Sequence, residues 1–191
     1  MEDIASVVRR ASRPDAASPD RADAFAEIVR RFQDMAVGYA HGLLGDFQLA
    51  EDAAQEAFVE AWRLLDRLDH PAAFPSWFRR LVHTRCTRLT RGKRPPLVGL
   101  DHAMELASPE AAPGDRLSEE EDRAQLHAAL HALSTSERVT TTLYYISGYT
   151  QAEVAEFLDI PVGTVKYRLH TARKRLREEV LAMVGSRLQA A

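Results

Sequence analysis

The sequence has only one cysteine, Cys86, among its 191 residues. A single cysteine excludes an internal disulfide and a cysteine-rich metal site, and it fits a reducing compartment. Also missing are the apolar core of a signal peptide and any run of about 18 apolar residues, the length that spans a membrane. We therefore expect a cytoplasmic protein without direct membrane insertion.

Signatures of catalysis are missing as well. The sequence contains no phosphate-binding glycine loop, no nucleophile elbow and no evident pair of catalytic carboxylates. His127 and His131 have a spacing that can bind a metal on one helix face, but no third ligand stands out. We expect a protein that is not an enzyme, with no cofactor, no metal and no small-molecule substrate.

The charges are unevenly distributed, although the net charge is only -3. Residues 77–94 contain seven Lys or Arg and no acid, and residues 166–177 contain six and none. Runs of charge most often mark a solvated helix face. They indicate nucleic-acid binding only when a second feature of the sequence supports it.

Residues 149–177 supply that second feature, because they predict two short helices joined by a tight turn. Thr150 and Glu153 have the spacing of a capping box, which begins the first helix. Pro161 ends it, and the second helix restarts near Val162. One side of the second helix is apolar, and the other side is polar and basic. The sequence therefore predicts a helix-turn-helix whose second helix enters the major groove of DNA. The apolar side consists of Val165, Leu169, Ala172 and Leu176.

Elsewhere the hydrophobic pattern has the period of a helix, and 46% hydrophobic residues suffice for two small cores. We expect an all-α protein with two small helical domains joined by a flexible linker, in which Pro, Gly and acidic residues break the periodicity. In the C-terminal domain, Ser134 and Glu137 form a second capping box, and Gly148 closes the helix that follows. The expected parts are a disordered leader (1–20), an N-terminal domain (21–94), the linker (95–118), a C-terminal domain (119–182) and a tail (183–191).

Three amphipathic stretches are expected to share the core of the N-terminal domain: residues 25–43, 49–68 and 76–90. In the last of these, the helical phase of Trp77 favours packing over base stacking. The phase of Cys86 favours a small buried side chain over a redox switch. The middle stretch has a second, outward face with both charges and one apolar side chain. This face consists of Asp52, Glu56, Val59 and Arg63, with Gln55 at its edge.

Two segments taken together resemble a known family. The run IPVGTVKYRLHTARKRL, with EDAAQEAFVEAW far upstream, resembles bacterial RNA polymerase sigma factors of the sigma-70 family, extracytoplasmic-function (ECF) class. The likeness covers residues 24–180. It implies a subunit that binds core RNA polymerase, recognises promoter DNA, helps to melt it and initiates transcription in a stress or signal response. It also implies contacts with the clamp helices of the largest subunit and with the beta flap, and control by an anti-sigma factor.

Position by position, the resemblance implies three sets of binding residues. The first, which would bind core polymerase, consists of Asp52, Gln55, Glu56, Val59 and Arg63. The second, which would bind the minus-10 element, consists of Arg79, Arg80, His83, Thr84, Thr87 and Arg91. The third, which would bind the minus-35 element, consists of Thr164, Lys166, Tyr167, Arg168, His170, Arg173 and Lys174.

Two positions depart from the family pattern. Thr84 stands where relatives commonly have asparagine, and Tyr167 stands where they have a small serine. The base preference therefore stays open. Two other functions also stay open: a helix-turn-helix regulator that acts without core polymerase, and a sigma-like decoy that only binds an anti-sigma factor. The first leaves the basic N-terminal segment unexplained, and the second has no need of two basic DNA-binding segments.

Overall fold

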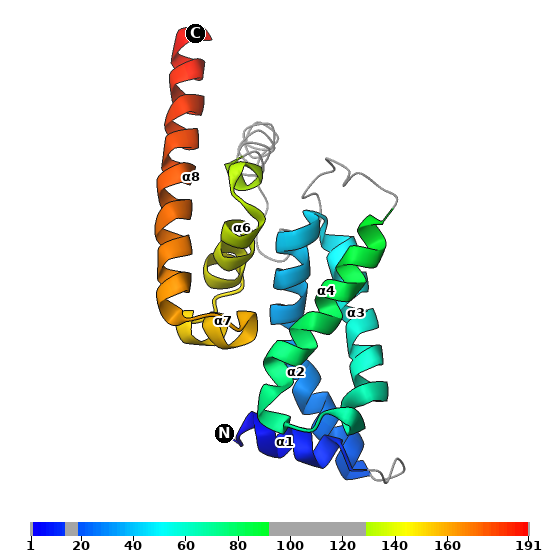
Figure 1. Ribbon diagram of the computed structural model, residues 1–191. Helices are drawn as coiled ribbons and strands as arrows, with labels where there is room; N and C mark the ends of the chain where they lie inside the picture. Colours follow the sequence, from blue (N-terminus) through cyan, green and yellow to red (C-terminus); the bar gives the residue numbers. More distant parts are fainter. Residues whose placement is uncertain (1, 14–18, 92–128, 191) are drawn as a thin grey trace, which may run out of the picture.

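The computed structural model describes residues 2–13, 19–91 and 129–190, with side chains described as far as residue 182. All regular structure in these ranges is helical, which confirms the expected all-α class with two helical domains (Figure 1). The predicted linker and His127 lie outside the described residues. The α-helices are α1 (Ile4–Ala11), α2 (Pro19–Leu44), α3 (Phe47–Leu64), α4 (Phe74–Thr90), α6 (Thr135–Thr141), α7 (Gln151–Leu158) and α8 (Val162–Ala190).

Helices α2, α3 and α4 pack together as the N-terminal domain. Gly45, with φ of 72°, makes the turn between α2 and α3, and Asp46 caps α3 by accepting a hydrogen bond from the Leu49 N–H at 2.9 Å. Aromatic rings fill the centre of this bundle: Phe74 and Phe78 are fully buried and stacked, with centroids 5.4 Å apart. The 3-10 helices η1 (Leu65–Arg67) and η2 (Pro71–Ala73) connect α3 to α4.

The prediction of a disordered leader over residues 1–20 is wrong for residues 4–11, which form α1. Val7, Val8 and Ala11 are fully buried against α2 and η2. With Ile4 they have the i, i+3, i+4, i+7 spacing of an amphipathic helix. A helix this short is unstable alone, so packing on the domain stabilises it. The Arg10 guanidinium also pairs with Glu2 at 2.7 Å and with Asp20 at 3.0 Å.

Both predicted capping boxes are present in the C-terminal domain. Ser134 with Glu137 precedes α6, and Thr150 with Glu153 precedes α7. Helix α6 continues as a π-helical turn, η3 (Thr142–Ile146), and Gly148 follows with φ of 75°. Residues 129–132 are helical too. Helix α8 continues to residue 190, so residues 183–190 of the predicted tail extend this helix.

The turn between α7 and α8 is closed by backbone hydrogen bonds. Asp159 adopts a left-handed conformation with φ of 56°, and the Ile160 N–H donates to the Ala155 carbonyl at 3.0 Å. This is how a helix commonly ends before a sharp change of direction. Helix α8 then starts directly behind Pro161, as predicted from the sequence.

The two domains pack against each other. Helix α6 and η3 lie along α2, and α7 lies against α4 (Figure 1). One continuous buried cluster includes Ala36 and Tyr39 of α2 together with Val139, Leu143 and Phe157 of the C-terminal domain. The sequence predicted two domains but not this contact between them.

Candidate functional site

Helix α8 turns its apolar side inward and its basic side outward. Val165, Leu169 and Ala172 are buried, whereas the Tyr167 side chain is 70% exposed. Thr164 and Arg168 are half-buried. The other predicted minus-35 residues are exposed, namely Lys166, His170, Arg173 and Lys174. The amphipathic phase inferred from the sequence is therefore correct.

A contact that sequence analysis missed fixes α8 relative to α6. The buried Glu137 carboxylate of the capping box accepts a hydrogen bond from Arg175 of α8 at 2.7 Å. Burial opposes the charged form, but hydrogen bonds from Ser134 and the charges of Arg175 and Arg168 favour it, so the pKa of Glu137 is lowered. Arg175, one of the six cations of residues 166–177, therefore positions α8 through this ion pair.

The second capping box gives a test of this local architecture. Thr150→Ala removes the hydroxyl that accepts from the Glu153 N–H at 3.3 Å, and we expect a loss of about 1 kcal/mol of stability. Thermal unfolding followed by circular dichroism measures it. Thr171→Ala is the matched control, because the Thr171 hydroxyl donates to the Tyr167 carbonyl within its own helix. Equal effects of the two substitutions would contradict the capping role of Thr150.

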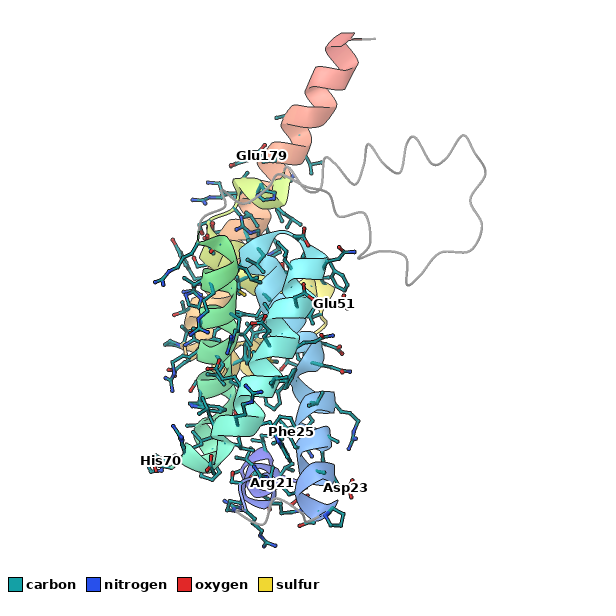
Figure 2. The ribbon with its side chains drawn as sticks, turned by 90° about the vertical axis from the view of Figure 1, so that its right-hand side faces the viewer. Arg21, Asp23, Phe25, Glu51, His70 and Glu179 are labelled. Atoms are coloured by element: carbon teal, nitrogen blue, oxygen red, sulfur yellow. The ribbon has the colours of Figure 1, made fainter. Side chains whose placement is uncertain are left out.

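The five predicted polymerase-binding residues of α3 are all exposed, and Val59 is 52% exposed. Helices α3 and α4 lie side by side, with Glu51 near the start of α3 and His70 beyond its end (Figure 2). A hollow of about 550 Å³ lies on this face. It is lined by Gln55, Glu56, Val59, Glu60, Arg63, Leu64 and Arg85.

Arg85 of α4 forms one wall of that hollow, and sequence analysis did not assign it to the α3 face. Its guanidinium donates to Glu60 at 2.7 Å and to Glu56 at 3.1 Å, and its side chain is 18% exposed. These bonds hold two of the carboxylates on α3 in place. These bonds join two helices, and the hydrophobic periodicity of one helix cannot predict a contact with another.

The predicted minus-10 residues lie on α4, but they differ in exposure. Arg80, His83, Thr84 and Arg91 are exposed, whereas Arg79 and Thr87 are half-buried. The Thr84 hydroxyl donates to the Arg80 carbonyl at 2.8 Å, and the Thr87 hydroxyl to the His83 carbonyl at 2.9 Å. Both hydroxyls therefore need to leave these bonds before they can donate to a base or phosphate.

Trp77 and Cys86 both pack against the core, as their helical phase predicted. Trp77 packs on the core with its ring centroid 5.8 Å from that of Phe74. Cys86 is 2% exposed, and burial raises the pKa of its thiol to about 12. A thiol in this state is a small apolar side chain with little thiolate at neutral pH.

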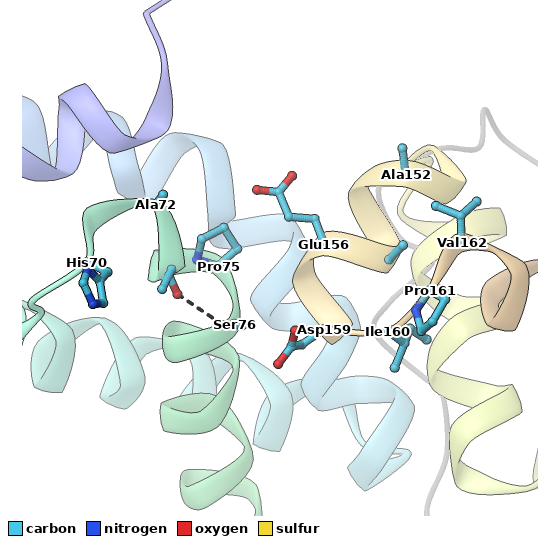
Figure 3. A pocket seen from close by; sticks show the side chains of 12 residues that line it. His70, Ala72, Pro75, Ser76, Ala152, Glu156, Asp159, Ile160, Pro161 and Val162 are labelled. Atoms are coloured by element: carbon cyan, nitrogen blue, oxygen red, sulfur yellow. Dashed lines mark hydrogen bonds between the residues drawn. The ribbon is translucent and has the colours of Figure 1, made fainter.

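A second hollow, of about 900 Å³, lies between the start of α4 and α7 (Figure 3). His70, Pro75 and Ser76 line one side, and Glu156 and Asp159 lie on the other side, near Pro161. Its two carboxylates make it unsuited to phosphates. It therefore does not continue the basic surfaces of α4 and α8.

In the described part of the chain, no three His, Cys, Asp or Glu side chains are grouped so that they could hold a metal ion. Among the same residues, no helix combines the length and the hydropathy needed to cross a membrane.

Comparison with known proteins gives consistent matches in both domains. Residues 28–95 match the family model of Sigma-70 region 2, and residues 123–176 match that of Sigma-70, region 4. The ECF RNA polymerase sigma factor SigW of Bacillus subtilis is 30% identical over 167 residues, which are 83% of this chain and 89% of SigW. The RNA polymerase sigma-H factor of Pseudomonas aeruginosa is 31% identical over 166 residues, 80% of this chain and 84% of that relative.

A solved structure has the same fold. CnrH, in complex with the cytosolic domain of CnrY, superposes with a TM-score of 0.60 at 24% sequence identity, covering 94% of this chain and 97% of CnrH. The helical architecture, the two family matches and the identity along most of SigW agree with the two motifs quoted from the sequence. The chain belongs to the ECF class of RNA polymerase sigma factors.

Proposed function

We propose that this sigma factor assigns its three tasks to three helices. Helix α3 docks on core RNA polymerase, α4 holds the separated strand of the minus-10 element, and α8 reads the minus-35 duplex. The observation that carries this proposal is the separation of outward faces: acids with an exposed valine on α3, and cations on α4 and α8. The polymerase supplies the chemistry, so the sigma factor itself catalyses nothing. The sigma factor works in the cytoplasm.

The chemistry of the α3 face supports a protein partner. Asp52 and Glu56 can pair with cations of a facing helix, Arg63 can pair with an acid, and Val59 supplies an apolar contact between them. The hollow beside Val59 leaves room for a partner's side chain. The clamp helices of the largest polymerase subunit are the partner that the family implies, with the beta flap as a second contact for the C-terminal domain.

The chemistry of α4 and α8 supports nucleic acid. Exposed Arg80 and Arg91 can neutralise phosphates of a separated strand, and His83 offers a flat ring beside them. On α8, Lys166, Tyr167 and His170 project from the outward face at positions suited to base edges in the major groove. Arg173 and Lys174 follow one turn later, where cations meet phosphates.

Control by an anti-sigma protein is part of the proposal. The fold neighbour CnrH is in complex with the cytosolic domain of a second protein, CnrY. That complex supports a similar arrangement for this chain, with a protein inhibitor that competes with core polymerase.

Reconstitution tests the proposed function and separates it from its rivals. The purified chain is added to core polymerase and a supercoiled promoter library, and transcripts are sequenced. We expect new start sites that depend on the chain. Binding to duplex DNA without binding to core would instead favour a conventional helix-turn-helix regulator. Binding to neither DNA nor core would favour a decoy for an anti-sigma factor.

The assignment of α8 predicts a selective loss. Lys166→Ala and His170→Ala are each expected to weaken minus-35 binding by about 1–3 kcal/mol, because each removes a donor from the groove-facing side. Core affinity should stay unchanged. Fluorescence anisotropy with a minus-35 duplex and with labelled core measures both. Arg9→Ala, at an exposed cation of α1, is the control, and an equal loss of core binding in the α8 variants would contradict the assignment.

A further inference from the structure

A third hollow, of about 300 Å³, lies where α2, α4, α6, α7 and α8 meet. Its walls combine two kinds of side chain. Leu43, Val139, Leu158 and Ile160 make an apolar wall, and Arg79 and Arg168 add two cations. Pockets for small molecules measure about 300–1,000 Å³ and have mostly apolar walls, with a few polar groups that orient the ligand. This arginine hollow therefore has the size and the composition of a small-ligand site.

The two cations of the arginine hollow have no acidic partner. Arg79 comes from α4 and Arg168 from α8, and both side chains are half-buried. Within the residues that the structure describes, neither guanidinium forms an ion pair, and no Asp or Glu lines the hollow. Glu137 responds to the charge of Arg168, but its carboxylate accepts hydrogen bonds from Ser134 and Arg175. Partial burial makes an unpaired charge costly, so the two arginines favour an anion in the hollow.

Tyr39 lines the same hollow but cannot supply that negative charge. Burial raises the pKa of its hydroxyl, and the nearby Arg79 guanidinium lowers this pKa by less. The hydroxyl therefore stays protonated at neutral pH, and it lies 3.1 Å from the Nδ1 atom of His83. Among the described residues, the Arg79 Nε atom is buried without a hydrogen-bond partner. Because buried donors are nearly always hydrogen-bonded, this N–H marks a position where a bound anion can accept.

The chemistry of the hollow selects an organic phosphate. The planar guanidinium of arginine donates two parallel hydrogen bonds to a phosphate, which makes arginine well suited to phosphate recognition. A phosphate monoester carries about 1.5 to 2 negative charges at pH 7 and therefore balances two guanidiniums, whereas a single carboxylate balances one. The apolar wall suits a carbon body, which inorganic phosphate does not have.

We propose that the arginine hollow binds a small organic phosphate, with its phosphate paired to Arg79 and Arg168 and its carbon body against the apolar wall. The binding itself does not depend on the proposed function. Its consequence rests on that function, which assigns both arginines to promoter DNA. The bound phosphate occupies these two cations and competes with the DNA backbone, while the α3 face stays exposed. Promoter affinity then falls as the concentration of the phosphate rises.

Titration calorimetry with the full chain tests the binding. Phenyl phosphate is the probe, because it joins a phosphate to an apolar ring, and inorganic phosphate and phenol each supply one half of it. We expect one saturable site for phenyl phosphate, with an affinity at least about tenfold above that of inorganic phosphate, and no measurable binding of phenol. Absence of saturable binding by phenyl phosphate would overturn the proposal. Equal affinity for inorganic phosphate would overturn it too, since the apolar wall would then contribute nothing.

Two matched double variants locate the site. Arg79→Gln/Arg168→Gln removes both cations of the hollow, and we expect at least about tenfold weaker binding of phenyl phosphate. Arg88→Gln/Arg177→Gln makes the same change of charge at exposed positions of α4 and α8 outside the hollow, and it should bind phenyl phosphate as the unmodified chain does. An equal loss in the two variants would show that phenyl phosphate responds to net charge, which contradicts a defined site. Circular dichroism verifies that both variants are folded.

Competition with DNA tests the consequence on the unmodified chain and needs no variant. Binding of a labelled minus-35 duplex is measured by fluorescence anisotropy at constant ionic strength, because contacts with DNA phosphates depend on salt. Saturating phenyl phosphate should weaken duplex binding at least about fivefold, whereas core affinity should stay within about twofold. Unchanged duplex affinity at saturation would overturn the proposal. A chain that binds no duplex even without phenyl phosphate would instead count against the proposed function, and calorimetry would still decide the binding.

Discussion

A chain with Asp52→Arg and Glu56→Arg is expected to lose detectable association with core RNA polymerase and to keep its helical content. Both side chains are exposed on α3, so arginine fits there without disturbing the core. The change reverses two charges on the face that we assign to the polymerase. Because Arg85 pairs with Glu56 in the unmodified chain, Glu56→Arg also places two cations side by side. Like charges across a protein interface cost several kcal/mol.

Size-exclusion chromatography with core polymerase, together with circular dichroism, measures both parts of this prediction. Asp23→Arg with Asp66→Arg makes the same change of charge at exposed positions outside the α3 face, and it is expected to leave assembly intact. Assembly by the α3 variant at wild-type affinity would show that another surface docks on core. An equal loss of assembly in the control variant would show that the effect comes from net charge and not from the α3 face.

Phe78→Ala is expected to lower the stability of the N-terminal domain by about 3–5 kcal/mol. Phe78 is fully buried, stacks on Phe74, and lies 4.5 Å from Phe58 between ring centroids, so its removal leaves a cavity between α3 and α4. A loss of this size is a large part of a typical domain's total stability. It would therefore also weaken strand binding by α4.

Urea unfolding followed by tryptophan fluorescence tests this prediction in one domain. Both tryptophans of the chain, Trp62 and Trp77, lie in the N-terminal domain, so the signal reports on that domain alone. Leu169→Ala, in the buried face of α8, is the matched control, because it should not change the tryptophan transition by a similar amount. A loss below about 1 kcal/mol for Phe78→Ala would contradict the packing described for these rings.

Local patterns in the sequence were sufficient to predict most of the helices. The capping boxes at Ser134 and Thr150 fix the starts of α6 and α7 through contacts within four residues, so the sequence contains the whole signal. The phase of α8 follows in the same way from Val165 and Leu169. The exposed set on α3 was predictable too, because a long amphipathic helix has one buried side.

Features that depend on contacts between distant segments could not be predicted in this way. Helix α1 has only eight residues, too few for a clear helical period in the sequence. The burial of Val7 and Val8 depends on contacts with α2 and η2, which the local sequence does not contain. The bonds from Arg85 to Glu56 and from Arg175 to Glu137 join separate helices. Gly42 looks like a tolerated helix residue until Val139 is placed beside it. For that reason the sequence did not predict that Arg79 and Arg168, two of the candidate DNA-binding residues, are half-buried.

The direction that α3 faces in the assembled transcription complex decides whether this helix docks on core polymerase. A structure of the chain assembled with core polymerase on promoter DNA measures this directly. We predict that Asp52, Glu56 and Val59 contact the clamp helices of the largest subunit, with α4 on the separated strand and α8 in the upstream major groove. A structure in which that face of α3 points into solvent would contradict the account.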